Sequence, residues 1–316
     1  MSDVENWDNI LFGACQDSLR AGLNPPDRPK ILYHFTDAAG LMGIIKDAGV
    51  WASLATSLND RSEVTFGVEL ARKVLQERIK RSETLYLTSI VSFLDPGNVP
   101  DEVRLEVNTF VISFCARIDK SGHWLHYGRS GDGFALGFEP GRLQVVPFDL
   151  ARVLYEEDEQ RHAIERIIDN AERALTNIVS SVSPDQQLYA TRVGAHMVAA
   201  HLWALAPRLK NPAFGEEEEW RLLTYHLKGG AHLELKGGHH GNGRAIPLQT
   251  GYRSVDGRVV PHQVLSFSKT RLPLAEIVLG ASVTIEPDDP GLRFFLEDLM
   301  PDQPIRLVRS HVPVRK

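Results

Sequence analysis

A histidine between two aromatic residues closes the first strongly apolar strand that the sequence predicts. Residues 32–36 read Leu-Tyr-His-Phe-Thr, and Asp37, directly after them, is a favourable helix N-cap. His34 titrates near neutral pH, and a helix N-terminus attracts anions. Side chains at this junction can therefore meet an anionic ligand, and this is where the sequence first indicates a binding site.

The elements around His34 follow from local signals. A helix is expected from Asp37 to just before Gly49, followed by a short strand at 50–53. The loop at 57–63 leads into an amphipathic helix whose apolar positions have helical spacing. Those positions are Val64, Val68, Ala71, Leu75 and Ile79.

The middle of the chain predicts a strand pair around a short helix. Residues 109–115 are β-branched and aromatic and predict a buried strand, and a loop and short helix follow at 122–129. Gly131-Asp132-Gly133 then turns into a strand at 134–138. Because no G-x-G-x-x-G and no helix follows, these glycines indicate a hairpin turn rather than a phosphate-binding loop.

The remaining pattern mixes strands and helices without a strict βαβ rhythm. This favours an α+β fold with a mixed, largely antiparallel central sheet and flanking helices. An N-terminal helix and a proline-rich linker would occupy residues 1–30, and a single domain residues 31–316, with a helical insertion at about 157–208. Further elements are expected at 143–155, 220–225, 263–268, 275–280, 289–299 and 305–309.

Composition excludes several classes of protein. The chain has 316 residues and a net charge of −6, which argues against coating nucleic acid through bulk charge. It has two cysteines, an acidic N-terminus unlike a signal peptide, and no uncharged apolar run of about 18 residues. These features predict a cytoplasmic protein with no membrane partner.

No metal site is expected. His196 and His201 are five residues apart, which does not match the spacing of H-E-x-x-H, and the cysteines have no C-x-x-C partner. His239 and His240 lie in a glycine-rich segment, where solvated loop histidines are commoner than metal ligands.

Short motifs occur in a fixed order from about residue 31 to 280. They are Leu32-Tyr33-His34-Phe35-Thr36, Leu58-Asn59-Asp60-x-x-Glu63, Ser113-Phe114-Cys115, Trp124-x-x-Tyr127-Gly128-x-x-Gly131-x-Gly133-Phe134-x-Leu136-Gly137-Phe138 and Lys210-x-x-x-Phe214-x-x-x-x-Glu219-Trp220-Arg221-Leu222. Together they resemble a bacterial family known as domain of unknown function 2971. Each motif is weak alone, and the shared order makes the resemblance specific.

The same motifs are similar, more distantly, to ADP-ribosyltransferase-type domains. Such domains carry a His or Arg on the first core strand, an aromatic or Ser-containing element in the middle, and a Glu on a later strand. The resemblance implies His34 for the first position, Ser113 and Tyr127 for the middle, and Glu219 for the last. It is an analogy at the level of fold and implies an expected chemistry.

That chemistry is cleavage of the nicotinamide–ribose bond of NAD through an oxocarbenium-like state. The resemblance implies Glu219 near the ribose hydroxyls, His34 as a ribose contact and either Tyr127 or Phe35 against the nicotinamide ring. Planar guanidinium groups would bind the pyrophosphate. The implied cofactor-binding residues are Phe35, Thr36, Ser113, Arg61, Arg129 and Arg221.

Each assignment has a structural alternative. His34 could be a hydrogen-bonded strand-end histidine, and Tyr127 could pack in the core beside Trp124. Glu219 ends a four-glutamate run, which is usually solvated, and Arg221 two residues on could pair with it. The Asn59-Asp60 pair of the loop could simply fix a turn.

Three functions follow. The first is an NAD-using ADP-ribosyltransferase-like enzyme, a toxin or phage-defence effector that modifies a macromolecule, with an unknown acceptor and a possible antitoxin. The second is a non-catalytic nucleotide- or nucleic-acid-binding module of the same fold, in which Arg221 ties up Glu219 while arginines line a groove. The third, ranked last, is a metal-dependent nuclease using Asp60 and Glu63.

Overall fold

The computed structural model describes residues 3–58, 62–100, 105–143, 148–229, 250–255, 257–267 and 272–313. The helices are α1 (Asp3–Arg20), α2 (Ala38–Lys46), α3 (Ser62–Arg81), α4 (Leu85–Phe93), α5 (Ser121–His126), α6 (Pro140–Leu143), α7 (Glu157–Val179), α8 (Pro184–Leu205) and α9 (Pro290–Leu299). The strands are β1 (Leu32–Thr36), β2 (Gly49–Leu54), β3 (Leu105–Cys115), β4 (Phe134–Phe138), β5 (Asp149–Arg152), β6 (Glu219–Gly229), β7 (Thr250–Val255), β8 (Arg258–Ser266), β9 (Leu274–Leu279) and β10 (Arg306–Arg309).

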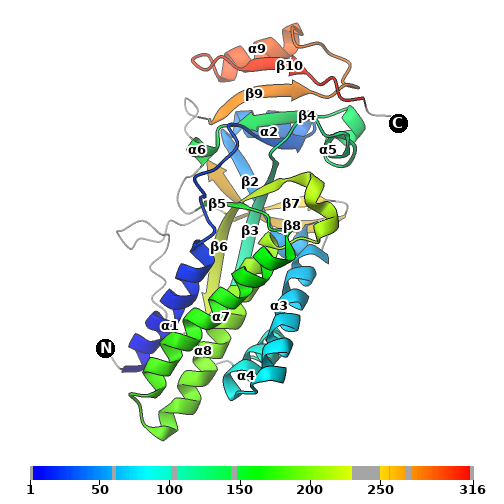
Figure 1. Ribbon diagram of the computed structural model, residues 1–316. Coiled ribbons are helices and arrows are strands. Elements are labelled where there is room, and N and C mark those ends of the chain that lie inside the picture. The colour runs from blue at the N-terminus through cyan, green and yellow to red at the C-terminus, as the bar shows by residue number, and fades with distance from the viewer. Residues whose placement is uncertain are drawn as a thin grey trace.

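The strands of the described residues form one sheet with the order β10-β9-β4-β1-β3-β2-β8-β7, and β6 pairs with both β3 and β5. Every pairing is antiparallel except that of β9 with β10. An α+β fold with a mostly antiparallel open sheet and flanking helices is therefore confirmed. Figure 1 shows β4, β9 and β10 with α9 at one end of the molecule and the long helices at the other.

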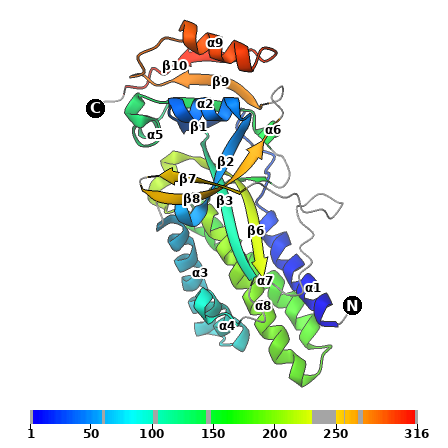
Figure 2. The same cartoon turned by 180° about the vertical axis from the view of Figure 1, so that it is seen from behind.

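The sheet divides at β3. Strand β6 occupies one edge of β3 along its whole length. On the other edge, β1 pairs only where Tyr33 faces Cys115, and β2 pairs only at Phe110 and Val111. Residues 112–114 therefore have no strand on that edge. The sheet opens there into two halves, one carrying β1, β4, β9 and β10 and the other β2, β8 and β7. In the view from behind, β9 and β10 lie at the top of the molecule and β7 and β8 near its middle (Figure 2).

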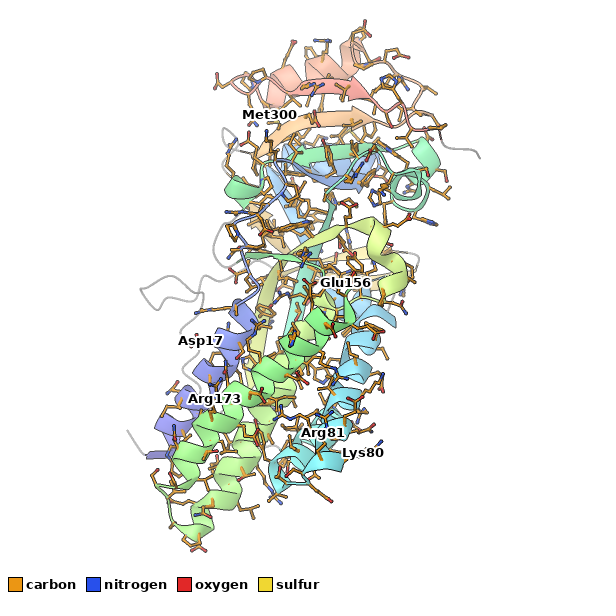
Figure 3. All side chains as sticks on the ribbon, in the orientation of Figure 1. Asp17, Lys80, Arg81, Glu156, Arg173 and Met300 are labelled. Atoms are coloured by element: carbon orange, nitrogen blue, oxygen red, sulfur yellow. The ribbon has the colours of Figure 1, made fainter. Side chains whose placement is uncertain are left out.

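Two large hydrophobic cores pack against the sheet. The first lies among α1, α3, α4, α7 and α8 against β3, and it buries Leu75 and Leu202. Helix α8 is apolar on nearly all sides because it lies at the centre of this bundle. Charged side chains such as Asp17, Arg81 and Arg173 lie exposed on α1, α3 and α7 (Figure 3).

The second core packs α2 and α9 against the sheet. It contains Leu32 of β1, Phe114 of β3, Phe138 of β4 and Leu296 of α9. Full burial of such side chains stabilises the fold by about 1.5–3 kcal/mol each. The stretch that includes His34 is therefore anchored on both sides, by β4 and by the core beneath α2.

Local signals placed most elements correctly. Asp37 caps α2, because its carboxylate accepts the Gly40 amide, and Ser183 with Gln186 forms a capping box at α8. Three elements, α4, α6 and β7, were not predicted. Within the described ranges, no helix is both long and apolar enough to cross a membrane.

Candidate functional site

A cavity of about 800 Å³ lies against the open edge of β3. Its walls come from the end of β1, from β2, from the start of α2, from the loop after α5 and from β7. Six of the nine residues that the sequence analysis assigned to the site line it, namely His34, Phe35, Thr36, Ser113, Tyr127 and Arg129. Of the other three, Arg61 lies outside the described residues, and Glu219 and Arg221 are not in the cavity wall.

His34 connects β1 to the open edge of β3. Its Nδ1 lies 3.0 Å from the carbonyl oxygen of Ser113, on the open edge of β3, and its ring contacts Phe114 edge-on. Burial lowers the pKa of His34, and the nearby charge of Arg253 lowers it further, although the bond to Ser113 opposes this. His34 is therefore a neutral, oriented hydrogen-bonding group at pH 7.

Two glycines allow the chain to pack closely around Thr36, near His34. A Cβ atom on Gly133 would lie 2.7 Å from the carbonyl oxygen of Thr36, and one on Gly40 would lie 2.0 Å from its hydroxyl. Phe35 contacts Trp124 edge-on, with ring centroids 5.0 Å apart. Gly133 thus serves packing. The predicted hairpin at Gly131-Asp132-Gly133 is wrong, because β4 pairs with β1 and β9 and not with β3, the strand before it.

The N-terminus of α2 is already occupied. Asp37 accepts hydrogen bonds from the amides of Gly40 and Ala39, and it receives Arg129 Nη2 at 2.6 Å. The Gly40 amide is the largest cause that lowers the pKa of Asp37, with Arg129 contributing. An anionic ligand at this helix end, as the sequence suggested, would have to displace Asp37 and compete for Arg129.

The loop that carries Arg129 is strained. Arg129 and Ser130 both have positive φ, 51° and 53°, which L-residues adopt at a cost of about 1–2 kcal/mol each. Tyr127, just before it, is half exposed and donates its hydroxyl to Glu217 at 3.1 Å. The loop therefore presents one aromatic ring and one paired arginine to the cavity.

Glu219 lies outside the cavity wall, in a buried ionic cluster. Arg221 donates to both of its carboxylate oxygens, at 2.8 and 2.9 Å, and Lys210 donates at 3.1 Å. Burial opposes ionisation, but these two cations outweigh it and lower the pKa of Glu219 to about 2. Strand β6 begins at Glu219 and turns it inward, so it is not part of a solvated run.

Ser113 connects that cluster to the cavity. Its hydroxyl bonds to the Glu219 carboxylate, while its carbonyl accepts His34. One residue of the open edge thus contacts both of the polar side chains that the resemblance had placed at the first and last catalytic positions. Both His34 and Glu219 contact Ser113, but of these two side chains only His34 lines the cavity.

Sequence reasoning missed the wall formed by β2 and β7. Trp51, Ser53 and Arg253 line the cavity, and the ring of His262 stacks on Trp51 with centroids 4.3 Å apart. The large aromatic Trp51, exposed between buried Val50 and Ala52, was a usable signal, whereas Ser53 is buried. Arg253 had no local signal, because only tertiary pairing of β7 brings it here.

The described residues around the cavity include neither a metal-binding group nor a reactive thiol. Among the described residues, no three His, Cys, Asp or Glu side chains gather to hold an ion. Cys15 and Cys115 are free and buried, and burial raises the pKa of both thiols. His239 and His240, and the Asn59-Asp60 pair, lie outside the described residues.

Comparison with known proteins adds one finding. No curated protein and no solved structure matches the chain. Residues 123–222, which run from α5 into β6 and include Tyr127 and Glu219, match the family model described as protein of unknown function (DUF2971). The match supports, over this part of the chain, the resemblance to domain of unknown function 2971 that the motifs indicated.

Proposed function

We propose that the cavity binds a nucleotide, and that NAD is its ligand. The observation that carries the proposal is the opening of the sheet at residues 112–114 of β3, which leaves a cavity of about 800 Å³ lined by both halves. This volume is in the range of sites for small molecules and cofactors. The Ser113 carbonyl on this edge already bonds to His34, so ligand contacts come mainly from the side chains that line the cavity.

The lining has the chemistry that a nucleotide needs. Trp51 and Tyr127 are about half exposed and can stack on a base or on nicotinamide. Neutral His34 is suited to ribose hydroxyls, and arginine to phosphate. A walled cavity and a net charge of −6 favour a free nucleotide over a nucleic-acid strand.

The arrangement of Glu219 favours binding over catalysis. An NAD-cleaving site needs a carboxylate near the ribose. The Glu219 carboxylate is held by Arg221 and Lys210, and the cavity wall does not include it. This is the arrangement expected for a binding module that keeps the fold without the reaction.

Calorimetric titration of NAD and ADP-ribose into the full chain tests the proposal. We expect saturable binding that Trp51→Ala weakens, while Phe294→Ala, a highly exposed aromatic on α9 outside the cavity, leaves it unchanged. Absence of binding by both ligands, or equal binding by both variants, would refute it. Thermal unfolding of each variant verifies that it is folded.

A second candidate is NAD cleavage by an ADP-ribosyltransferase-like enzyme, with a macromolecular acceptor and a toxin or phage-defence role that an antitoxin would control. The hydrogen bond between Ser113 and Glu219 favours it, because it leaves the carboxylate one side chain from the cavity. Release of free nicotinamide by the purified protein is the readout. Cleavage predicts release that His34→Ala and Glu219→Ala abolish, and the binding module predicts none.

A further inference from the structure

Within the described part of the chain, Arg253 is a cation without a counter-charge. It lines the cavity from β7 and donates one hydrogen bond, from Nη2 to the Ser53 hydroxyl at 2.7 Å. Its Nε is buried without a partner, and among the described residues no carboxylate forms an ion pair with it. Desolvation lowers the pKa of Arg253, and no acidic side chain of the described residues raises it again.

The other cations near the cavity are neutralised. Arg129 is held by Asp37, and Arg221 by Glu219. Within the part of the chain that the structure describes, Arg253 is thus the cavity-lining cation that an incoming anion can reach without breaking an ion pair. A guanidinium that is partly removed from water without compensation is unfavourable, and an anion would relieve that cost.

The neighbours of Arg253 hold it in place for this role. Its guanidinium carbon lies 6.0 Å from the centroid of Trp51, within range of a cation–π contact. Trp51 is itself stacked on His262, and Gly251 makes room for that ring, since a Cβ there would lie 2.4 Å from its Nε2. The side chain is therefore positioned before any ligand arrives.

From this geometry we infer that Arg253 and Ser53 form the phosphate subsite of the cavity. This subsite rests on the proposed nucleotide ligand. A phosphate group of that ligand binds the Arg253 guanidinium and the Ser53 hydroxyl, with Trp51 beside it. The sequence had assigned phosphate contact to Arg61, Arg129 and Arg221 instead. Charge-assisted bonds from guanidinium to phosphate make Arg253 a determinant of affinity for phosphorylated ligands over nucleosides.

The test titrates ADP-ribose, adenosine and inorganic pyrophosphate into the full chain and three variants. Arg253→Gln should weaken ADP-ribose about 10- to 100-fold and leave adenosine unchanged. Arg253→Lys should recover part of the loss, because it restores charge without the fork. Arg152→Gln, an exposed arginine of β5 paired with Glu159, is the matched control and should bind like the original chain.

The outcomes separate this inference from the proposed function. Full ADP-ribose affinity in a folded Arg253→Gln chain overturns the subsite and leaves nucleotide binding standing. Pyrophosphate binding that depends on Arg253, without binding of ADP-ribose, NAD or adenosine, supports the subsite and refutes the nucleotide. Failure of all these ligands to bind the original chain refutes both.

Discussion

Two arginines on the same sheet, Arg221 and Arg253, have opposite surroundings. Arg221 on β6 is almost fully buried and donates to both oxygens of Glu219 and to the carbonyl of Pro207. Arg253 on β7 lines an open cavity and donates only to the Ser53 hydroxyl among the described residues. Arg221 therefore belongs to an ionic cluster whose charges are paired, whereas Arg253 lacks a carboxylate partner among the described residues.

This difference separates structural charges from ligand-binding charges. A buried ion pair whose partners are all satisfied has no capacity left for a ligand, and removing one member is costly. A cation that lacks a counter-charge contributes little to the free energy of unfolding, and binding of an anion to it is favourable. The sequence shows both residues simply as arginines, so their roles depend on the acidic groups that tertiary structure places nearby.

The largest effect is expected on stability in the Glu219 cluster. Glu219→Gln leaves Arg221 and Lys210 buried without their carboxylate, and should reduce the free energy of unfolding by about 3–5 kcal/mol. Arg221→Gln should do the same. Urea unfolding measures both, and a loss below about 1 kcal/mol for either variant would show that the cluster is not the closed structural unit described above.

Buried histidines should produce the next largest effect, through pH. His201 in the helical bundle bonds to the Met197 carbonyl and to Gln16, and burial lowers its pKa from 6.5 to about 4. Its stabilising contribution is complete above pH 6.5 and is lost as pH falls toward 4, because the unfolded chain takes up the proton first.

Unfolding at pH 7 and pH 5 in the original chain and in His201→Asn tests this. The histidine should account for about 2 kcal/mol of the difference between the two pH values. An equal pH dependence in both chains would mean that His201 is not kept neutral by the bundle.

Arg253→Gln should have a much smaller effect on stability than Arg221→Gln. It removes one hydrogen bond to Ser53 but also an uncompensated cation, so the free energy of unfolding should change by no more than about 1 kcal/mol. Urea unfolding of the two variants side by side measures the contrast. A loss from Arg253→Gln as large as that from Arg221→Gln would make Arg253 a structural residue.

The smallest effect is a shift in the titration of His34. The charge of Arg253 contributes to the lowered pKa of both His34 and His262. An anion on Arg253 should offset that charge and raise both pKa values, while His201 in the bundle stays unchanged. Proton NMR titration with and without pyrophosphate measures this, and unshifted cavity histidines at saturation would argue against an anion at Arg253.

Much of the fold could be predicted from local sequence signals. Apolar periodicity and caps gave α3, α7 and α8, and β-branched content gave β3, because these properties are encoded within each segment. The two strands that form one wall of the cavity, β2 and β7, differed in whether local signals predicted them. β2 was predicted from its apolar residues, whereas β7 has mostly polar, alternately exposed positions and no such signal.

The site was predictable only in part, for a different reason. The strand end at His34, with Phe35 and Thr36, could be found because its motif is local and precedes a helix cap. Whether Glu219 enters the cavity or pairs with Arg221 depends on how β6 aligns with β3, which long-range pairing decides. The phosphate partner Arg253 is more than 200 residues from His34 in sequence, and no spacing rule connects them.

Hydrogen–deuterium exchange with and without saturating NAD tests the central claim most directly, because it locates the ligand. A nucleotide in the opening of the sheet should slow amide exchange at the open edge of β3 around residues 112–114, and in β7 around Arg253, with no change in α8. Unchanged exchange at these two segments, or protection confined to the helical bundle, would contradict a nucleotide site between the two halves of the sheet.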